Sequence, residues 1–271
     1  MRTPKALVIT GNGINTERES AHACRLAGME ADIAHMALIF SGEVQLKDYN
    51  FLYFPGGFLD GDDLGSAKAG AVRFKYGKVV KEGSKARFED ELLGLVERGG
   101  LVLGVCNGFQ LMVKMGLLPF MEGKLKQSVS LSHNDSGRFE DRWVYLAVEP
   151  DSPCVFTRGA ENLYYPVRHG EGKFIPSSNE TLSAIEAQKL VPVRYTTPKG
   201  EITSEYPWNP NGSVNAIAGL CDPTGRLFGL MPHPEAFVHR TQHPRWTRED
   251  LPEEGLGLIL YKNAAEYIRQ S

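Results

Sequence analysis

The chain has 271 residues, enough for one large α/β domain or for one domain with an appendage. Its hydrophobic fraction of 42%, charged fraction of 23% and formal net charge of −3 are ordinary for a globular protein, and they give no reason to expect nucleic acid or a membrane as partner. No apolar run approaches the roughly 20 residues of a membrane span, and the N-terminus lacks a signal-peptide cleavage region. The four cysteines are widely spaced without a C-x-x-C pair, which argues against a disulfide framework and a metal site and indicates a cytoplasmic protein.

The first part of the chain alternates short apolar runs with stretches of helical spacing. Three runs are typical of buried strands: residues 6–9, 31–36 and 49–54. After the first, Thr16 and Glu19 have the spacing of a capping box, and the helix that they begin is expected to end before Gly28. The third run ends in Pro55-Gly56-Gly57-Phe58. Strands separated by helices predict an open, mostly parallel sheet with ligands at the carboxyl ends of its strands.

The next stretch, from residue 60 to about 85, is less regular. Its lysine-rich segment around residues 68–87 has no function that residue chemistry assigns. After it, Phe88, Leu92 and Leu95 fall on one face of a helix that is expected to end at Gly99-Gly100.

Residues 101–111 have the pattern of a sharp turn between a strand and a helix. An apolar run ends at Gly104, Cys106 follows, and Gly108 precedes a stretch of helical spacing. Glycines flank such an elbow because it brings backbone segments too close for larger side chains. The thiol is expected at the N-terminus of the helix, where unpaired N–H groups and the helix dipole favour the thiolate.

From residue 128 onward the pattern changes to strands and turns. Strands are expected at residues 142–148 and 191–196, and a hairpin at residues 214–220 and 226–231. The second hairpin strand leads into Pro232-His233-Pro234-Glu235, and residues 255–268 have the spacing of an amphipathic helix. No linker divides the chain, so we expect a single domain over residues 1–271.

Cys106 is the candidate nucleophile, because the glycine-flanked turn is expected to present its side chain rather than bury it. The other cysteines are expected to be small buried hydrophobes: Cys24, Cys154 and Cys221. A thiol needs a base and a group that orients the base. His233 and Glu235 follow an apolar strand and lie two residues apart, so on an extended segment they point to the same side and reach the sheet edge of Cys106.

A two-donor oxyanion hole is the third expected element. The strand that ends in Gly56-Gly57 can expose the N–H of Gly57, and the N–H of Asn107 lies directly after the cysteine. Each donor of such a hole contributes roughly 3 kcal/mol to transition-state stabilisation.

These residues resemble a known family. A strand followed by Gly-Gly, then Gly-Val-Cys-Asn-Gly-Phe-Gln, then Pro-His-Pro-Glu, in that order, resembles the class I (triad) glutamine amidotransferases. More narrowly, the chain is similar to the glutaminase subunits of phosphoribosylformylglycinamidine (FGAM) synthase. Further stretches carry this narrower match: residues 134–140, 166–172 and 209–213.

The resemblance implies a flavodoxin-like open sheet with helices on both faces and added antiparallel strands in the C-terminal half. It implies hydrolysis of L-glutamine, with Cys106 as nucleophile, His233 and Glu235 completing the triad, and Gly57 and Asn107 holding the oxyanion. Candidate substrate contacts are Gln110, Phe58 and His169. No cofactor is implied for this chain. Ammonia is expected to pass to a large synthetase chain, with or without a small third subunit, which uses ATP and magnesium to amidate formylglycinamide ribonucleotide in purine biosynthesis.

Three alternatives stay open at this point. Another glutaminase of the same fold can serve a different synthetase. The intracellular peptidase and deglycase family also has a cysteine elbow, although a histidine commonly follows its cysteine where Asn107 stands here. A non-catalytic binding subunit can retain the fold, although an intact triad argues against that.

Overall fold

The computed structural model describes residues 2–81 and 84–271, and it is built on a six-stranded sheet of order β12-β13-β6-β3-β1-β2. The strands of this sheet are β1 (Lys5–Thr10), β2 (Glu30–His35), β3 (Phe51–Phe54), β6 (Leu101–Val105), β12 (Gly219–Cys221) and β13 (Leu227–Leu230). All neighbours are parallel except the edge pair β12–β13. This arrangement confirms the predicted open, mostly parallel sheet, and it brings the ends of β3, β6 and β13 to one edge.

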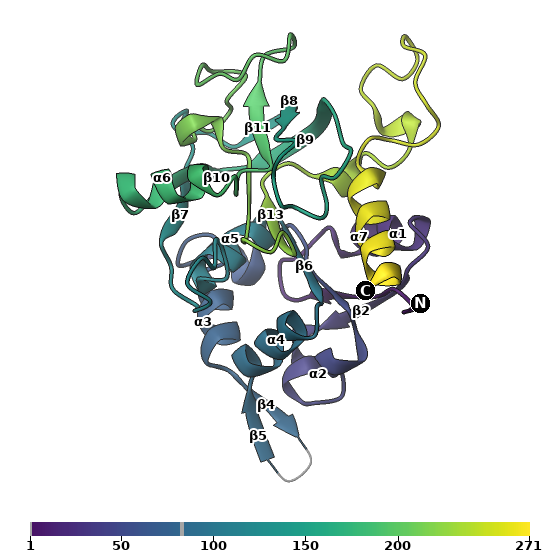
Figure 1. The fold of residues 1–271 in the computed structure, drawn as a ribbon, viewed down its shortest axis with the longest axis vertical. Helices are drawn as coiled ribbons and strands as arrows, with labels where there is room; N and C mark the ends of the chain where they lie inside the picture. The colour runs from purple at the N-terminus through teal and green to yellow at the C-terminus, as the bar shows by residue number, and fades with distance from the viewer. Residues whose placement is uncertain (1, 82–83) are drawn as a thin grey trace.

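Helices cover both faces of the sheet, as predicted (Figure 1). The long helices are α1 (Glu17–Leu26), α3 (Lys68–Tyr76), α4 (Phe88–Glu97), α5 (Asn107–Met115) and α7 (Leu258–Gln270). Tyr53 stacks on Tyr261 of α7, whereas its neighbour Phe54 meets Phe74 of α3 edge to face. Because consecutive strand residues point to opposite faces, α7 and α3 cover opposite sides of β3. Helix α1 packs beside α7, and α4 and α5 pack with α3.

The C-terminal half adds antiparallel strands, which also confirms the prediction. One pair joins β7 (Val129–His133) to β10 (Glu171–Pro176), and a three-stranded sheet has the order β11-β8-β9. The strands of the latter are β8 (Glu140–Val148), β9 (Leu163–His169) and β11 (Val193–Thr196). The backbone N–H of His233 donates to the carbonyl of Pro166 at 2.8 Å, so β9 is tied directly to the segment after β13.

Several local predictions are corrected. The Thr16 side chain makes no cap hydrogen bond at the start of α1, because its hydroxyl pairs with Gly56 instead. The expected strand at residues 214–220 begins as a 3-10 turn and forms the ladder with β13 only from Gly219. The stretch expected to be irregular contains α3 and a hairpin of β4 (Lys78–Lys81) and β5 (Ser84–Arg87), which projects from the body of the molecule (Figure 1); residues 82–83 lie outside the described part.

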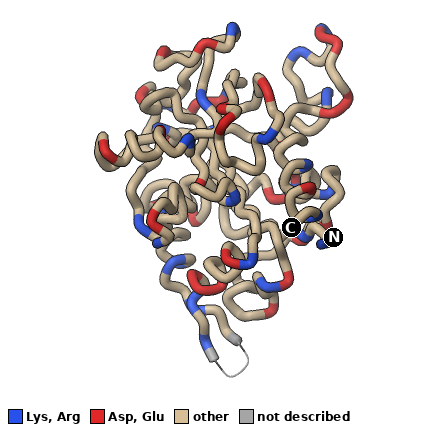
Figure 2. The backbone as a smooth tube through the Cα atoms, in the orientation of Figure 1, with Lys and Arg blue, Asp and Glu red and all other residues tan. Residues whose placement is uncertain are grey.

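The remaining short elements connect the layers. They are α2 (Met36–Phe40), α6 (Asn179–Ala187) and the 3-10 turns η1 (Leu46–Asp48), η2 (Leu59–Asp62), η3 (Val214–Ala216), η4 (Pro234–Ala236) and η5 (Arg240–Gln242). Acidic and basic residues are interspersed along the backbone (Figure 2). Within residues 2–81 and 84–271, no helix has the length and apolar character needed to cross a bilayer.

Candidate active site

Cys106 lies at the tip of the turn between β6 and α5, as predicted. Its backbone has φ 51° and ψ −106°, a strained combination for a residue with a side chain. The N–H of Cys106 donates to the carbonyl of Leu230 at 2.8 Å, which anchors the turn to β13. A strained backbone held by its surroundings is typical of a nucleophile that a strand presents at the start of a helix.

The glycines of the turn are required by close packing. A Cβ atom on Gly104 would lie 2.5 Å from the Met112 sulfur and 2.7 Å from the backbone of Gly108. A Cβ atom on Gly108 would lie 1.9 Å from the carbonyl oxygen of Phe54, an atom of β3 that cannot move alone. Helix α5 therefore packs directly against the end of β3.

We expect Gly108→Ala to destabilise the fold by about 3 kcal/mol or more, because the clash is with backbone rather than with a flexible side chain. The measurement is the free energy of unfolding in urea. Gly94→Ala is the matched control, since a Cβ there meets only the Arg98 guanidinium, at 3.3 Å, and alanine favours the interior of α4. Equal stability of the two variants would contradict the packing argument.

The Cys106 side chain is only 5% exposed, so the expectation of an exposed thiol is wrong. Instead, the thiol is reached through a cavity of about 240 Å³. The cavity is lined by Gly57, Phe58, Asp62, Ser66, Cys106, Gln110, His133, Phe139, Arg168, His169, Gly170 and Glu171. The Cys106 Sγ lies 3.5 Å from the carbonyl oxygen of Arg168. The antiparallel half of the chain therefore forms one wall of the site.

His233 and Glu235 meet beside the cysteine. His233 Nδ1 lies 2.5 Å from Glu235 Oε1, and both side chains are buried. The pair is formed across the tight turn η4, not along an extended segment as predicted, because Pro234 begins a 3-10 turn that returns Glu235 to the ring. A Cβ on Gly56 would lie 2.7 Å from His233 Cε1 and 3.5 Å from Cys106 Cβ, so Gly56 leaves the space that the ring and the cysteine share.

The charge state of His233 follows from its neighbours. Burial favours the neutral ring, but attraction to the Glu235 carboxylate, which is hydrogen-bonded to Nδ1, and to Cys106 outweighs burial and raises the pKa of His233 to about 9. Its Nε2 has no hydrogen-bond partner among the described residues. At neutral pH the His233 ring is therefore positively charged, and its Nε2–H is available to donate to a ligand.

Gly57 lies on the strained loop after β3. Its φ is 144°, and a Cβ there would lie 2.5 Å from the carbonyl oxygen of Gly13, so no other residue fits without displacement. The loop is held on both sides, because Gly56 N–H donates to Thr16 Oγ1 at 2.9 Å and Phe58 N–H donates to Gly13 O at 2.7 Å. The cavity wall includes Gly57 together with Cys106.

The Asn107 side chain has a part that the sequence did not indicate. Its Oδ1 accepts a hydrogen bond from the N–H of Leu59 at 3.0 Å, and its Nδ2 donates to Asp62 Oδ1 at 3.1 Å and to Gln110 Oε1 at 2.9 Å. Gln110 in turn donates to the carbonyl of Glu171. Asn107 therefore fastens the loop after Gly57 to helix α5, and Gln110 extends the same network to β10.

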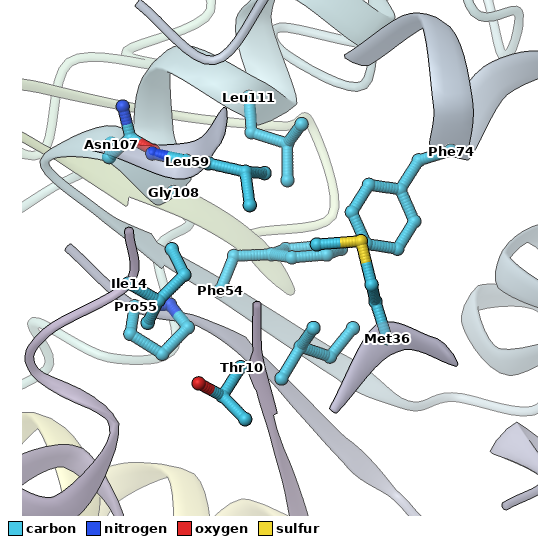
Figure 3. A pocket seen from close by; sticks show the side chains of 11 residues that line it. Thr10, Ile14, Met36, Phe54, Pro55, Leu59, Phe74, Asn107, Gly108 and Leu111 are labelled. Carbon is cyan, nitrogen blue, oxygen red and sulfur yellow. The ribbon is translucent and has the colours of Figure 1, made fainter. Parts of the chain in front are cut away.

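An apolar base supports this loop from below (Figure 3). Phe54, Phe74 and Met36 pack against one another beneath Leu59 and Leu111, which approach from the loop and from α5. The space left among them is about 10 Å³, near the lower limit for a single water molecule. This region is packed core, and the larger cavity beside Cys106 is the one with room for a ligand.

The other two candidate substrate contacts differ in their surroundings. Phe58 is 45% exposed, and its ring centre lies 6.2 Å from that of Phe139, which is also exposed, in the wall of the cavity. His169 is buried, and its Nδ1 lies 3.0 Å from Asn134 Oδ1. Burial and the nearby charge of His233 lower the pKa of His169 to about 3, so its ring is neutral.

The remaining cysteines do not line the cavity beside Cys106. Cys24, Cys154 and Cys221 are buried thiols, as predicted. Across the described ranges, no group of three or more His, Cys, Asp or Glu side chains is arranged to hold a metal ion.

Comparison with known proteins identifies the family. Residues 3–268 match the model of the CobB/CobQ-like glutamine amidotransferase domain. The chain is 44% identical to phosphoribosylformylglycinamidine synthase subunit PurQ of Dehalococcoides mccartyi, with 100% of both chains covered, and 38% identical to the subunit of the same name of Methanococcus maripaludis, with 98% of both covered. A chain in the structure of PurLQS from Thermotoga maritima superposes with a TM-score of 0.67 at 27% identity, covering 96% of this chain and 98% of that one. The chain therefore belongs to the PurQ family, the glutaminase subunits of phosphoribosylformylglycinamidine synthase.

Proposed function

We propose that Cys106, His233 and Glu235 are the residues with which this glutaminase hydrolyses L-glutamine to glutamate and ammonia. One observation carries the assignment. A strained cysteine turn and the loop of Gly57 line one cavity, and a paired His–Glu lies beside the cysteine, although the three come from the ends of β6, β3 and β13. No two of these features are close in sequence, and each supplies one part of an acyl transfer.

The chemistry follows from the charges described above. The Cys106 thiolate attacks the side-chain amide carbon of glutamine, and the N–H groups of Gly57 and Asn107 hold the oxyanion. Protonated His233, oriented by Glu235, gives its Nε2 proton to the amide nitrogen, which leaves as ammonia. The resulting neutral His233 then takes a proton from water, and the hydroxide attacks the thioester to release glutamate and regenerate the thiolate.

Two further residues are candidates for contact with the substrate. Gln110 and Phe58 line the same cavity, and we infer that they contact the substrate there. The Gln110 amide already has two intramolecular hydrogen bonds, so its second Nε2 proton is the group that it can offer. Phe58 offers an apolar face for the methylene groups of glutamine.

We further propose that the ammonia passes to a separate synthetase chain. That chain uses ATP and magnesium to amidate formylglycinamide ribonucleotide, and it assembles with this one in the cytoplasm with or without a small third subunit. Support comes from the similarity of this chain to a chain in the structure of PurLQS from Thermotoga maritima. Support also comes from Phe58 and Phe139, two exposed aromatic rings in the cavity wall. Exposed aromatic side chains are enriched at protein–protein interfaces, where the partner covers them. Residues 1–271 act as one domain in this assembly.

The isolated chain is expected to be a poor glutaminase, because the synthetase completes its site. Glutamate release should rise at least about tenfold, or roughly 1.4 kcal/mol in barrier height, when the matching synthetase, ATP and the ribonucleotide are added. The measurement is glutamate production with and without these additions. Full activity of the chain alone would contradict the expectation, and stimulation only by a different synthetase would favour a glutaminase of another pathway.

A further inference from the structure

The buried imidazole of His169 has a ring nitrogen that makes no hydrogen bond within the described part of the chain. His169 ends β9, is 2% exposed and lines the cavity that contains Cys106. Its neighbour Arg168 places a carbonyl oxygen 3.5 Å from the Cys106 thiol, so the strand end lies directly beside the reacting atom. His169 Nε2 has no hydrogen-bond partner among the described residues. A buried polar atom without a partner is costly unless a ligand completes it.

Asn134 determines which nitrogen of His169 carries the proton. The N–H of Gly172 donates to Asn134 Oδ1 at 3.1 Å, and a backbone N–H can only donate, so this atom is the amide oxygen. The Asn134 Nδ2 correspondingly donates to two carbonyls, those of Arg138 at 2.9 Å and His169 at 2.8 Å. His169 Nδ1, 3.0 Å from Oδ1, must therefore be the donor of that hydrogen bond.

The opposite nitrogen is consequently an acceptor. A neutral imidazole with its proton on Nδ1 carries a lone pair on Nε2. The ring packs against Gly172, where an added Cβ would lie 2.5 Å from His169 Cε1 and 2.6 Å from Nδ1, so the glycine leaves the space that the ring occupies. Asn134 is itself buried, so water does not compete for the hydrogen bond that holds the tautomer.

We propose that His169 Nε2 accepts a hydrogen bond from the side-chain amide N–H of glutamine, and that Asn134 is the positioning residue that keeps this nitrogen an acceptor. This inference rests on the proposed function. An amide nitrogen offers two N–H groups, whereas the carboxylate of glutamate offers only lone pairs. The same atom therefore binds the substrate and disfavours the product. It also orients the nitrogen that His233 must protonate.

The test compares two substrates that differ at this atom. L-glutamate γ-methyl ester keeps the α-ammonium group and the acyl carbon of glutamine, but its leaving group has no N–H. In the complex with the synthetase, His169→Leu is expected to lower kcat/KM for glutamine about 10- to 100-fold and for the ester less than about threefold, because only glutamine loses a hydrogen bond to a buried acceptor. The inhibition constant of glutamate should fall in the variant, because the repelling lone pair is gone.

Equal losses with both substrates would overturn the inference, since they would assign His169 to the α-ammonium group or to the fold. If the proposed function itself were wrong, the wild-type complex would hydrolyse neither substrate, so the two failures are distinguishable. His169→Gln is the conservative variant, because its side-chain oxygen can replace the acceptor. It should recover part of the glutamine activity.

The role of Asn134 has a spectroscopic readout that folding alone does not change. In the wild-type protein labelled with ¹⁵N-histidine, the ring of His169, assigned by its loss in His169→Gln, is expected to carry its proton on Nδ1 and none on Nε2. Asn134→Asp adds a negative charge next to Nδ1, so it should place a second proton on Nε2 and reduce glutamine turnover more than ester turnover. A wild-type ring with its proton on Nε2 would overturn the inference without any variant.

Discussion

Replacing Cys106 with alanine is expected to lower kcat for glutamine hydrolysis by about 10⁴-fold or more, because no other group in the cavity can form the thioester. The loss should be measured as glutamate release by the complex with its synthetase. Synthesis from added ammonia should remain, because the synthetase reaction does not use the thiol. The free energy of unfolding of the alanine variant should lie within about 1 kcal/mol of the wild-type value. Alanine and cysteine have the same backbone preferences, so the strained conformation at φ 51° costs both about equally.

Cys24→Ala is the matched control for this variant. Cys24 is a buried thiol on α1, outside the cavity wall, so its replacement should leave the turnover of glutamine near the wild-type value. Mass spectrometry with a glutamine-derived alkylating agent should find the label on Cys106 and on no other cysteine. Glutamate release by Cys106→Ala at the wild-type rate would refute the assignment of the nucleophile.

Glu235→Gln is expected to reduce kcat by about 10²- to 10⁴-fold while the fold is retained, because glutamine has almost the same shape but no charge. In the wild type, attraction to Glu235 and Cys106 outweighs burial and holds the pKa of His233 near 9. Without the carboxylate, burial is opposed by Cys106 alone, and the pKa of His233 falls. The His233 ring is then less often protonated at pH 7, so it has a proton to give to the leaving amide nitrogen in a smaller fraction of molecules.

The pH dependence provides the measurement. A folded pKa of about 9, above the ordinary 6.5, means that folding stabilises protonated His233. This contribution to the free energy of unfolding is fully present below about pH 6.5 and is lost as the pH rises through 9. The free energy of unfolding in urea should therefore show this dependence in the wild type and a weaker one in Glu235→Gln. Identical profiles for the two proteins would show that Glu235 does not control the ring.

The elements of the site with local signals could be predicted from the sequence. Gly104, Cys106 and Gly108 indicate the turn because the packing that requires them involves the residues immediately before and after it. His233 and Glu235 were found because the end of a parallel strand is a known position for functional groups. Their contact across a 3-10 turn could not be predicted, because two residues that follow a strand and lie two apart are equally compatible with an extended segment.

The hydrogen-bond network around the site could not be predicted in the same way. The Asn134–His169 contact depends on the register of β7 against β10 and on the chain returning 35 residues later. The Asn107 side chain pairs with Leu59 and Asp62, some 45 to 48 residues earlier. Such contacts between distant segments leave no periodic pattern in the sequence. The resemblance to relatives marks the stretches around both residues and makes His169 a candidate substrate contact, but it assigns no role to Asn134.

The side chain of Asn107 has a consequence for any attempt to redesign the substrate range. The same residue contributes its backbone N–H to one end of the proposed oxyanion hole and holds, through Leu59 and Asp62, the loop that carries the other end at Gly57. The Asn107 side chain therefore fixes the distance between the two N–H donors of the proposed oxyanion hole. Lengthening the loop to admit a larger amide would therefore displace both donors at once. A variant with broader specificity needs new hydrogen bonds that hold the loop in place before its pocket is widened.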